Sequence, residues 1–244
     1  MFAASSAPRT RPLVALRALV ALASDPDDLP KVFTVIESLP GRSPALMLSR
    51  MRASATGRCI LADKPDLRVQ LADRDALREL PEGTLGRAYL ELVEREGMTT
   101  KGIVDASDEG MVRRDEVIEE QRTISDRMRD THDLWHVVTG YGPDLLGEAA
   151  LLCFTYAQTK HPGIALIALL AILKSVPNAR PVMIEGYRRG KRAEWLPAVA
   201  WEGLLARPLT EVRALLHIGP PPAYEPVTSA ALRGTGALPD RAAA

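Results

Sequence analysis

The chain reads HDLWHVVTGYGPDLLGEAALLCFTYAQT over residues 132–159. Glycine and proline interrupt this stretch at Gly140-Tyr141-Gly142-Pro143, because both residue types favour turns over helix interiors. The pattern is helical on either side, which predicts a long helix from about Asp115 to Thr139 and a second from Asp144 to about Thr159. So short a connection predicts that the two helices form a tight antiparallel hairpin.

Two of the four histidines, His132 and His136, lie in this stretch, and Asp133 lies between them. On a helix, His136 lies ~40° around the axis from His132 and Asp133 lies ~100° around, so the three side chains project into one sector. Neutral imidazole and carboxylate are ligands for zinc, iron, manganese and cobalt. The spacing therefore indicates a divalent-metal site, although a satisfied surface pair of His132 and Asp133 would explain it as well.

Glu148 supplies a fourth candidate ligand from the second helix. It follows the turn by about as much as His136 precedes it, so an antiparallel hairpin brings the two residues to equal depth. The rest of this helix is apolar, and a carboxylate buried without a partner is costly. A metal would provide that partner, as would a helix cap or a basic side chain. Two imidazoles and two carboxylates around M²⁺ would be formally neutral and would leave room for water or substrate, as in catalytic sites.

The remaining sequence also predicts helices. Of the 244 residues, 46% are hydrophobic and only 5% aromatic, a composition that favours helix over strand, and 19 prolines predict frequent helix ends. We expect an all-α single domain of packed, partly antiparallel helices over residues 12–218. A flexible arm is expected at 1–11 and a Pro-rich flexible tail at 219–244. The other expected helices cover residues 12–24, 29–39, 44–53, 85–95, 164–175, 181–194 and 208–218, with helical pieces at 58–62 and 73–80.

Composition argues against several classes of protein. The 31 basic residues are balanced by 31 acidic ones, so nothing indicates a nucleic-acid partner. The longest apolar run, residues 163–173, is shorter than the ~18–20 residues that span a bilayer and is typical of a buried helix. Cys59 and Cys153 give neither a disulfide framework nor a thiolate metal cluster, and they fit a reducing compartment.

Common catalytic motifs also fit poorly. A zincin needs Glu directly after its first histidine, where this chain has Asp133, and an HD-type phosphohydrolase needs a further histidine upstream. Gly-rich phosphate loops and a Ser or Cys nucleophile elbow are absent from the sequence. The metal hypothesis therefore depends on the hairpin alone.

His132-Asp133-x-x-His136, eleven intervening residues and then Glu148 resemble the metal motif of the coenzyme Q biosynthesis protein 4 family. The resemblance extends to LPEGTLGRAY at residues 80–89, where Thr84 replaces the family's Ser. It continues through YRRG at 187–190 and through WE at 201–202 with PLTEVR at 208–213. It covers roughly residues 12–218, and the Pro-rich tail has no counterpart in it.

This resemblance implies a mostly helical protein of ubiquinone biosynthesis that is peripheral to membranes. It implies that His132, Asp133, His136 and Glu148 hold a divalent metal, usually zinc, with iron, manganese and cobalt as alternatives. The implied activity is that of a lyase removing the C1 carboxyl group of a polyprenylated 4-hydroxybenzoate, of the 4-hydroxy-3-methoxy-5-polyprenylbenzoate type. With redox-active iron the step would be oxidative and would leave a hydroxyl on C1. The alternative is a non-catalytic prenyl-lipid-binding scaffold that organises other quinone-biosynthesis enzymes.

Catalytic roles are assigned to Asp133 and His132, because protonation at C1 needs a proton shuttle, for which Asp133 or a metal-bound water would serve. The expected partners are a polyprenylated aromatic substrate, a membrane surface, other ubiquinone-biosynthesis enzymes and further copies of the chain in a homo-oligomer. Apolar residues of 145–156 and 164–173 would line a groove for the prenyl tail, or else form ordinary core. The basic run at 188–192 would contact acidic headgroups, or else form a solvated face. The expected location is the bacterial cytoplasm, peripheral on the inner membrane, or the matrix side of the mitochondrial inner membrane in a eukaryote.

Overall fold

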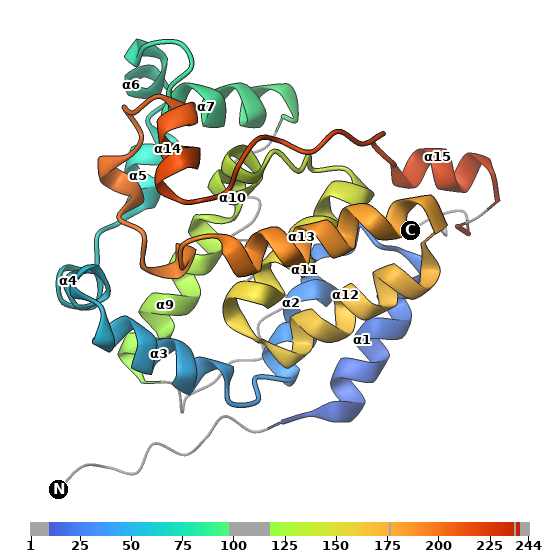
Figure 1. Ribbon diagram of the computed structural model, residues 1–244. Helices are drawn as coiled ribbons and strands as arrows, with labels where there is room; N and C mark the ends of the chain where they lie inside the picture. The colour runs from blue at the N-terminus through green and yellow to red at the C-terminus, as the bar shows by residue number, and fades with distance from the viewer. Residues whose placement is uncertain (1–9, 98–117, 176, 237, 240–244) are drawn as a thin grey trace, which may run out of the picture.

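The computed structural model describes residues 10–97, 118–175, 177–236, 238 and 239 (Figure 1). Over these residues the secondary structure consists of fourteen α-helices and three short 3₁₀ helices. The strand-like pairing within the described part is one isolated bridge, between Thr84 and Pro208. The predicted all-α single domain is confirmed. None of the helices described is both long and apolar enough to cross a bilayer.

Short helices make up the N-terminal half, and most of them begin at a proline or a capping side chain. Proline lies in the first turn of the first three helices, and Asp28, Ser54 and Asp73 each accept a hydrogen bond from a first-turn backbone N–H. The bounds are α1 Pro12–Ser24, α2 Leu29–Ser38, α3 Ser43–Ala53, α4 Ala55–Asp63, α5 Leu67–Ala72, α6 Arg74–Glu79 and α7 Leu85–Arg95.

The C-terminal half contains most of the longer helices. Their bounds are α9 Glu119–Asp130, α10 His132–Thr139, α11 Leu145–Thr159, α12 Pro162–Lys174, α13 Arg180–Arg192, α14 Leu209–Leu215 and α15 Ser229–Gly234, with 3₁₀ helices η1 Pro177–Ala179, η2 Leu196–Ala198 and η3 Trp201–Gly203. The single helix predicted from 115 to 139 is two helices, α9 and α10. Thr131 separates them, and its hydroxyl donates to the carbonyl of Arg127 at 2.9 Å, a local bond that bends helices. Residues 115–117 of that prediction lie outside the described residues.

Helix α11 lies at the centre of the molecule and packs closely against α13 (Figure 1). Two glycines of α13 allow the close approach. A Cβ on Gly186 would lie 2.4 Å from the carbonyl oxygen of Ala150, and one on Gly190 would lie 2.6 Å from that of Phe154. Residues four apart share one face of a helix, so both glycines face α11. This contact fixes the helix that carries Glu148.

The main hydrophobic core surrounds this pair of helices. Trp135 of α10 is buried, and its ring stands edge-on to that of Phe154 at 6.1 Å between centroids. Leu146, Ala149 and Phe154, which the sequence offered as groove residues or as core, are buried members of this cluster. Their burial favours the core alternative at these positions.

The described part of the C-terminal segment contacts the helical domain. Residues 219–236, which we call the C-terminal strap, lead from the end of α14 across the α10–α11 turn and through α15 (Figure 1). Tyr224 and Val227 pack on the main core, and Arg233 pairs with Asp25 and Asp27 between α1 and α2. The strap of the tail that was predicted to be flexible thus makes defined contacts with the domain, for which proline lowers the entropy lost on docking. Residues 1–9 of the arm predicted at 1–11, and residues 237 and 240–244 of the predicted tail, lie outside the described part.

Candidate metal centre

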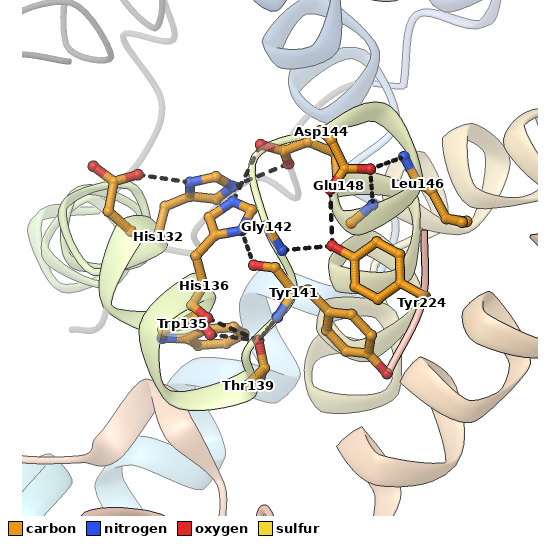
Figure 2. Close-up of polar contacts among 12 residues, drawn as sticks. His132, Trp135, His136, Thr139, Tyr141, Gly142, Asp144, Leu146, Glu148 and Tyr224 are labelled. Carbon is orange, nitrogen blue, oxygen red and sulfur yellow. Dashed lines mark hydrogen bonds and ion pairs between the residues drawn. The ribbon is translucent and has the colours of Figure 1, made fainter. Parts of the chain in front are cut away.

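Three side chains from α10 and α11 converge across the turn between these helices. His132 and His136 come from α10 and Glu148 from the first turn of α11, and one potential ligand atom of each lies within 4.8 Å of the others. The Nε2 atom of His136 lies 3.1 Å from Oε1 of Glu148, and Nε2 of His132 lies 3.7 Å from Oε2. Figure 2 shows both imidazoles directed at the same carboxylate. The hairpin therefore brings together three of the four residues that the spacing predicted as ligands.

Local sequence shapes the turn that makes this convergence. Gly140 ends α10 in the left-handed conformation, with φ +75°, which glycine adopts at little cost. Asp144 caps α11 by accepting hydrogen bonds from the backbone N–H groups of Leu146 and Gly147 at 3.1 and 3.2 Å. Because the connection is short, residues about one turn before and after it meet at the same depth.

Each imidazole is held through its other ring nitrogen. Nδ1 of His136 donates to the backbone carbonyl of Tyr141 at 2.8 Å, and Nδ1 of His132 donates to Oδ1 of Asp133 at 3.2 Å. Both partners are oxygen acceptors, so Nδ1 carries the proton and Nε2 is the nitrogen left to bind a metal. The two hydrogen bonds thus fix ring orientation and tautomer together.

Asp133 lies beside His132, outside the converging set of three. Its side chain is only 17% exposed, and burial raises the pKa of the carboxyl, but the hydrogen bond and charge of His132 outweigh burial and lower it overall. Asp133 is the next residue along the helix, so its offset of ~100° directs it past His132 and away from α11. The structure therefore gives this predicted ligand the geometry of a group that orients His132.

His136 and Glu148 form an ion pair. Burial lowers the pKa of His136, but the negative charge of the neighbouring Glu148 carboxylate outweighs it and raises this pKa to about 9. Burial likewise raises the pKa of Glu148, and the two histidines, His136 first, overcome that effect and lower it to about 2. The proton on Nε2 of His136 is therefore the one that an incoming metal must displace.

The donor set fits a divalent cation. Nε2 of His136 is fully buried and makes no hydrogen bond of acceptable geometry, although a carboxylate oxygen lies 3.1 Å away. Such a buried atom is short of a partner, which a metal ion would be. Two imidazoles and one carboxylate are the protein ligands of one class of catalytic zinc site, where a fourth position remains for water or substrate. The side chains of His132 and Glu148 are 37% and 34% exposed, so this centre opens to solvent.

A contact from a distant part of the chain supports α10, and it was not among the predictions made from the sequence. Arg213 of α14 donates to the carbonyl oxygens of Val137 and Val138 at 2.9 and 3.0 Å. These are among the carbonyls that the end of a helix leaves without partners, and a guanidinium there also suits the helix dipole. No local pattern relates Arg213 to α10, because the contact joins positions 75 residues apart.

The predicted basic run at 188–192 does not form one charged face. Arg189 is buried, and its guanidinium carbon lies 5.0 Å from the centre of the Tyr141 ring. Glu185 pairs with the two other arginines of the run. Arg189 therefore supports the turn beside the candidate centre, while Arg188, Lys191 and Arg192 remain on the surface.

The other segments of the resemblance surround the hairpin. Thr84 caps α7, which packs on α10, and the buried Tyr89 lies close enough to Asp133 that burial and this carboxylate both raise the pKa of the phenol. Glu202 accepts a two-point hydrogen bond from Arg127 of α9. These residues buttress the helices on which the candidate ligands lie.

Known proteins match this chain over most of its length. The family profile of coenzyme Q (ubiquinone) biosynthesis protein Coq4 matches residues 8–222. The ubiquinone biosynthesis protein coq4, mitochondrial, of Talaromyces stipitatus is 35% identical over 179 residues, which cover 70% of this chain and 59% of that protein. The COQ4 protein of Pyricularia oryzae is 32% identical over 204 residues, which cover 80% and 63%. The match thus spans about three fifths of the length of these curated relatives.

A solved structure shares the fold. A crystal structure from Nostoc punctiforme, provisionally assigned to ubiquinone biosynthesis, superposes with a TM-score of 0.63 at 21% identity and covers 86% of this chain and 100% of the other. The structural match, at 21% identity, shows the fold alone, whereas the matches in sequence are strong enough to show the family. The chain therefore belongs to the coenzyme Q (ubiquinone) biosynthesis protein Coq4 family.

Proposed function

We propose that this chain acts in ubiquinone biosynthesis as a metal-dependent lyase that removes the C1 carboxyl group of a polyprenylated 4-hydroxybenzoate. Family membership supports the pathway. The single observation that carries an enzyme over a scaffold is the convergence of three donors, His132, His136 and Glu148, without a fourth among the described residues, at a place that opens to solvent. A purely structural metal would be enclosed by four protein ligands, whereas a catalytic one keeps a position free.

A divalent ion held by these three residues, with zinc the first candidate and iron, manganese and cobalt the alternatives, would supply Lewis-acid polarisation of a phenolic or carboxylate oxygen. His136 is the rigid donor, because it is buried and bonded to the Tyr141 carbonyl. His132 and Glu148 are partly exposed and border the side from which the substrate enters.

The reaction breaks the bond between C1 and its carboxyl group, releases CO₂ and places a proton on C1. Asp133 is ionised and occupied by Nδ1 of His132, so its proposed contribution is to orient that imidazole. Water at the exposed edge of the site then provides the proton. This narrows the earlier hypothesis, in which Asp133 itself was one candidate for the shuttle.

The proposal extends to a membrane surface, where a polyprenyl substrate resides. Helix α1 buries alanines and turns larger apolar side chains outward, among them Leu16 and Val20. Its neighbour α12 exposes Leu169 and Leu173. An exposed apolar helix face that also carries an arginine, here Arg17, is typical of helices that lie on anionic lipid. Peripheral attachment at the inner membrane, other ubiquinone-biosynthesis enzymes and a homo-oligomer belong to the same proposal.

Vesicle co-sedimentation tests the membrane surface. A Leu16→Gln, Val20→Gln variant should bind less well to vesicles that contain phosphatidylglycerol. The matched control is Val69→Gln on α5, because Val69 is 67% exposed against 62% for Val20. Equal binding by the variant, the control and the wild type would refute α1 as the contact surface.

Turnover tests the lyase. The full chain is loaded with Zn²⁺, Fe²⁺, Co²⁺ or Mn²⁺ and incubated with a 4-hydroxy-3-methoxy-5-polyprenylbenzoate, and the product is identified by mass spectrometry. We expect loss of CO₂, abolished in His136→Ala and retained in His217→Asn, which changes an exposed histidine of the turn that follows α14. Hydrogen at C1 of the product indicates simple decarboxylation, and hydroxyl indicates the oxidative route. No turnover with any of the four metals would refute the proposal.

A further inference from the structure

Tyr224 of the C-terminal strap lies against the turn that joins the two ligand-bearing helices. Its phenol oxygen accepts a hydrogen bond from the backbone N–H of Gly142 at 2.7 Å and donates one to Oδ2 of Asp144 at 2.8 Å (Figure 2). We propose that Tyr224 is a positioning residue for the metal centre, which holds the turn in the geometry that lets His136 and Glu148 meet. The inference rests on the proposed metal-dependent function and deepens it.

The first link from Tyr224 runs to His136 through a single peptide group. The carbonyl of Tyr141 and the N–H of Gly142 belong to the same planar amide. On one side this amide accepts the Nδ1 proton of His136 at 2.8 Å, and on the other it donates to Tyr224. The plane cannot rotate without weakening one of the two hydrogen bonds, so the phenol fixes the acceptor that sets the His136 ring. The two bonds also polarise the same amide and strengthen each other.

The second link runs to Glu148 through the cap of α11. The Asp144 carboxylate accepts from Leu146 and Gly147 with Oδ1 while Oδ2 accepts from Tyr224. The backbone N–H of Glu148 donates to the carbonyl of Asp144 at 2.8 Å, which places Glu148 directly on the capped turn. Anchoring Asp144 therefore sets the depth at which the Glu148 carboxylate enters the site.

The strap reinforces this contact with its backbone. Val227 donates its N–H to Oδ1 of Asp144 at 2.9 Å and accepts the N–H of Leu145 at 2.8 Å. Two glycines allow the strap to approach the hairpin closely. A Cβ on Gly147 would lie 2.5 Å from the phenol oxygen of Tyr224, and one on Gly140 would lie 2.5 Å from the Pro221 side chain. The family profile ends at residue 222, so Tyr224 lies outside the part of the chain that it matches.

The test is Tyr224→Phe in the full chain, which removes one oxygen and keeps the ring. The matched control is Tyr156→Phe, which removes the phenol oxygen of a ring that stacks on Tyr187, two turns along α11 from Glu148. Three quantities are measured: Co²⁺ affinity by chelator competition, the visible ligand-field spectrum of the Co²⁺ protein, and amide hydrogen exchange of residues 140–148 without metal. In Tyr224→Phe we expect about tenfold weaker Co²⁺ binding, an altered spectrum and faster exchange, with all three unchanged in the control.

The outcomes separate the inference from the function on which it rests. A wild-type chain that binds no Co²⁺ would overturn the metal-dependent function and the positioning role with it. A wild-type chain that binds Co²⁺, together with a Tyr224→Phe variant of unchanged affinity and spectrum, would overturn the positioning role alone. That holds even where the melting temperature falls, because a strap with a merely structural role lowers stability without altering the centre.

Discussion

Two ion pairs inside this domain are built in opposite ways. Arg127 of α9 and Glu202 of η3 meet through two parallel hydrogen bonds of 2.8 and 3.0 Å, and Arg127 also donates to the carbonyl of Val199. Their side chains are 6% and 18% exposed. His136 and Glu148 instead approach at one pair of atoms, 3.1 Å apart, without an acceptable hydrogen bond, and Glu148 is 34% exposed.

The two pairs differ in whether their polar atoms can still bind a cation after the pair has formed. A guanidinium and a carboxylate match in shape, so the first pair closes on itself and joins α9 to the chain that follows α13. In the second pair, the imidazole and the carboxylate both direct potential ligand atoms at the same small space. The single proton between them occupies little of that space. A closed pair therefore holds helices together, whereas an open pair beside solvent can take up a cation.

The largest effect on metal affinity should come from removing the negative charge of Glu148 in the second pair. Glu148→Gln keeps size and polarity but removes the anionic ligand, so metal affinity should fall by roughly 1,000-fold, about 4 kcal/mol, beyond the 10- to 100-fold typical of residues that only support ligands. The protein should still fold, because the apolar packing of the hairpin is untouched. Bound metal after dialysis and chelator competition measure this. Unchanged metal content would remove Glu148 from the site.

Breaking the closed pair should act on stability instead. Glu202→Gln leaves the Arg127 guanidinium buried without its counter-ion, so the free energy of unfolding should fall by about 3 kcal/mol. Denaturant titration measures this, and Glu194→Gln is the control because its partner His217 is exposed. Metal affinity below the unfolding midpoint should stay at the wild-type value. If Glu202→Gln changed metal affinity more than the free energy of unfolding, the two pairs would not differ in function as proposed.

The next largest effect should be that of pH on the affinity of the His136–Glu148 pair for a metal. The Nε2 proton of His136, whose pKa is raised to about 9, must leave before a metal binds, so apparent affinity should rise about tenfold per pH unit up to pH 9. Between pH 7 and 9 this amounts to roughly 100-fold, and Glu148 adds nothing there because its pKa is lowered to about 2. In Glu148→Gln the largest raising influence on the pKa of His136 is lost, so burial lowers this pKa against only the Tyr141 carbonyl and Asp133, and the dependence near neutral pH should flatten. Competition titrations across this range would show a flat wild-type profile if no proton is displaced.

A smaller effect is expected from the residue that orients His132. Asp133→Asn keeps the side chain's shape but weakens the acceptor for Nδ1, so metal affinity should fall by about tenfold. Asp126→Asn on α9 is the control, because that carboxylate is 46% exposed and pairs with Arg129. A loss comparable to that of Glu148→Gln would make Asp133 a ligand after all, as the sequence first indicated.

The smallest effect should come from the far end of the C-terminal strap. Arg233→Gln removes the partly exposed ion pairs to Asp25 and Asp27, which should lower the free energy of unfolding by about 1 kcal/mol or less. Metal affinity should not change, since Tyr224 keeps its two hydrogen bonds. Thermal unfolding and chelator competition together decide this. A tenfold loss of affinity would show that tension along the whole strap, and not the phenol alone, supports the centre.

Most of the helical architecture could be predicted from local pattern. The first helix and the one after Thr84 begin and end where proline, capping residues and apolar spacing indicated, at Pro12–Ser24 and Leu85–Arg95. The division of the predicted long helix at Thr131 was not foreseen, because Thr back-bonding depends on a rotamer and not on sequence spacing.

The convergence of three candidate ligands could likewise be predicted from local pattern. His132, His136 and Glu148 lie at fixed distances from one turn, so helix geometry was enough to place them together. The role of Asp133 was harder, since a separation of ~100° allows either a ligand or a neighbour that holds one. Tyr224 and Arg213 reach the hairpin from remote segments, and composition alone made the strap resemble a free tail.

The compact placement of the three donors within residues 132–148 also bears on how the chain folds. Closing so short a loop costs little entropy and takes well under a microsecond, whereas the strap must wait for contacts across 80 residues of sequence. The hairpin can therefore assemble early, and a cation bound to it would act as a template on which α13 and then the strap condense. Metal added at the start of refolding should accelerate the reaction more than metal added at its end.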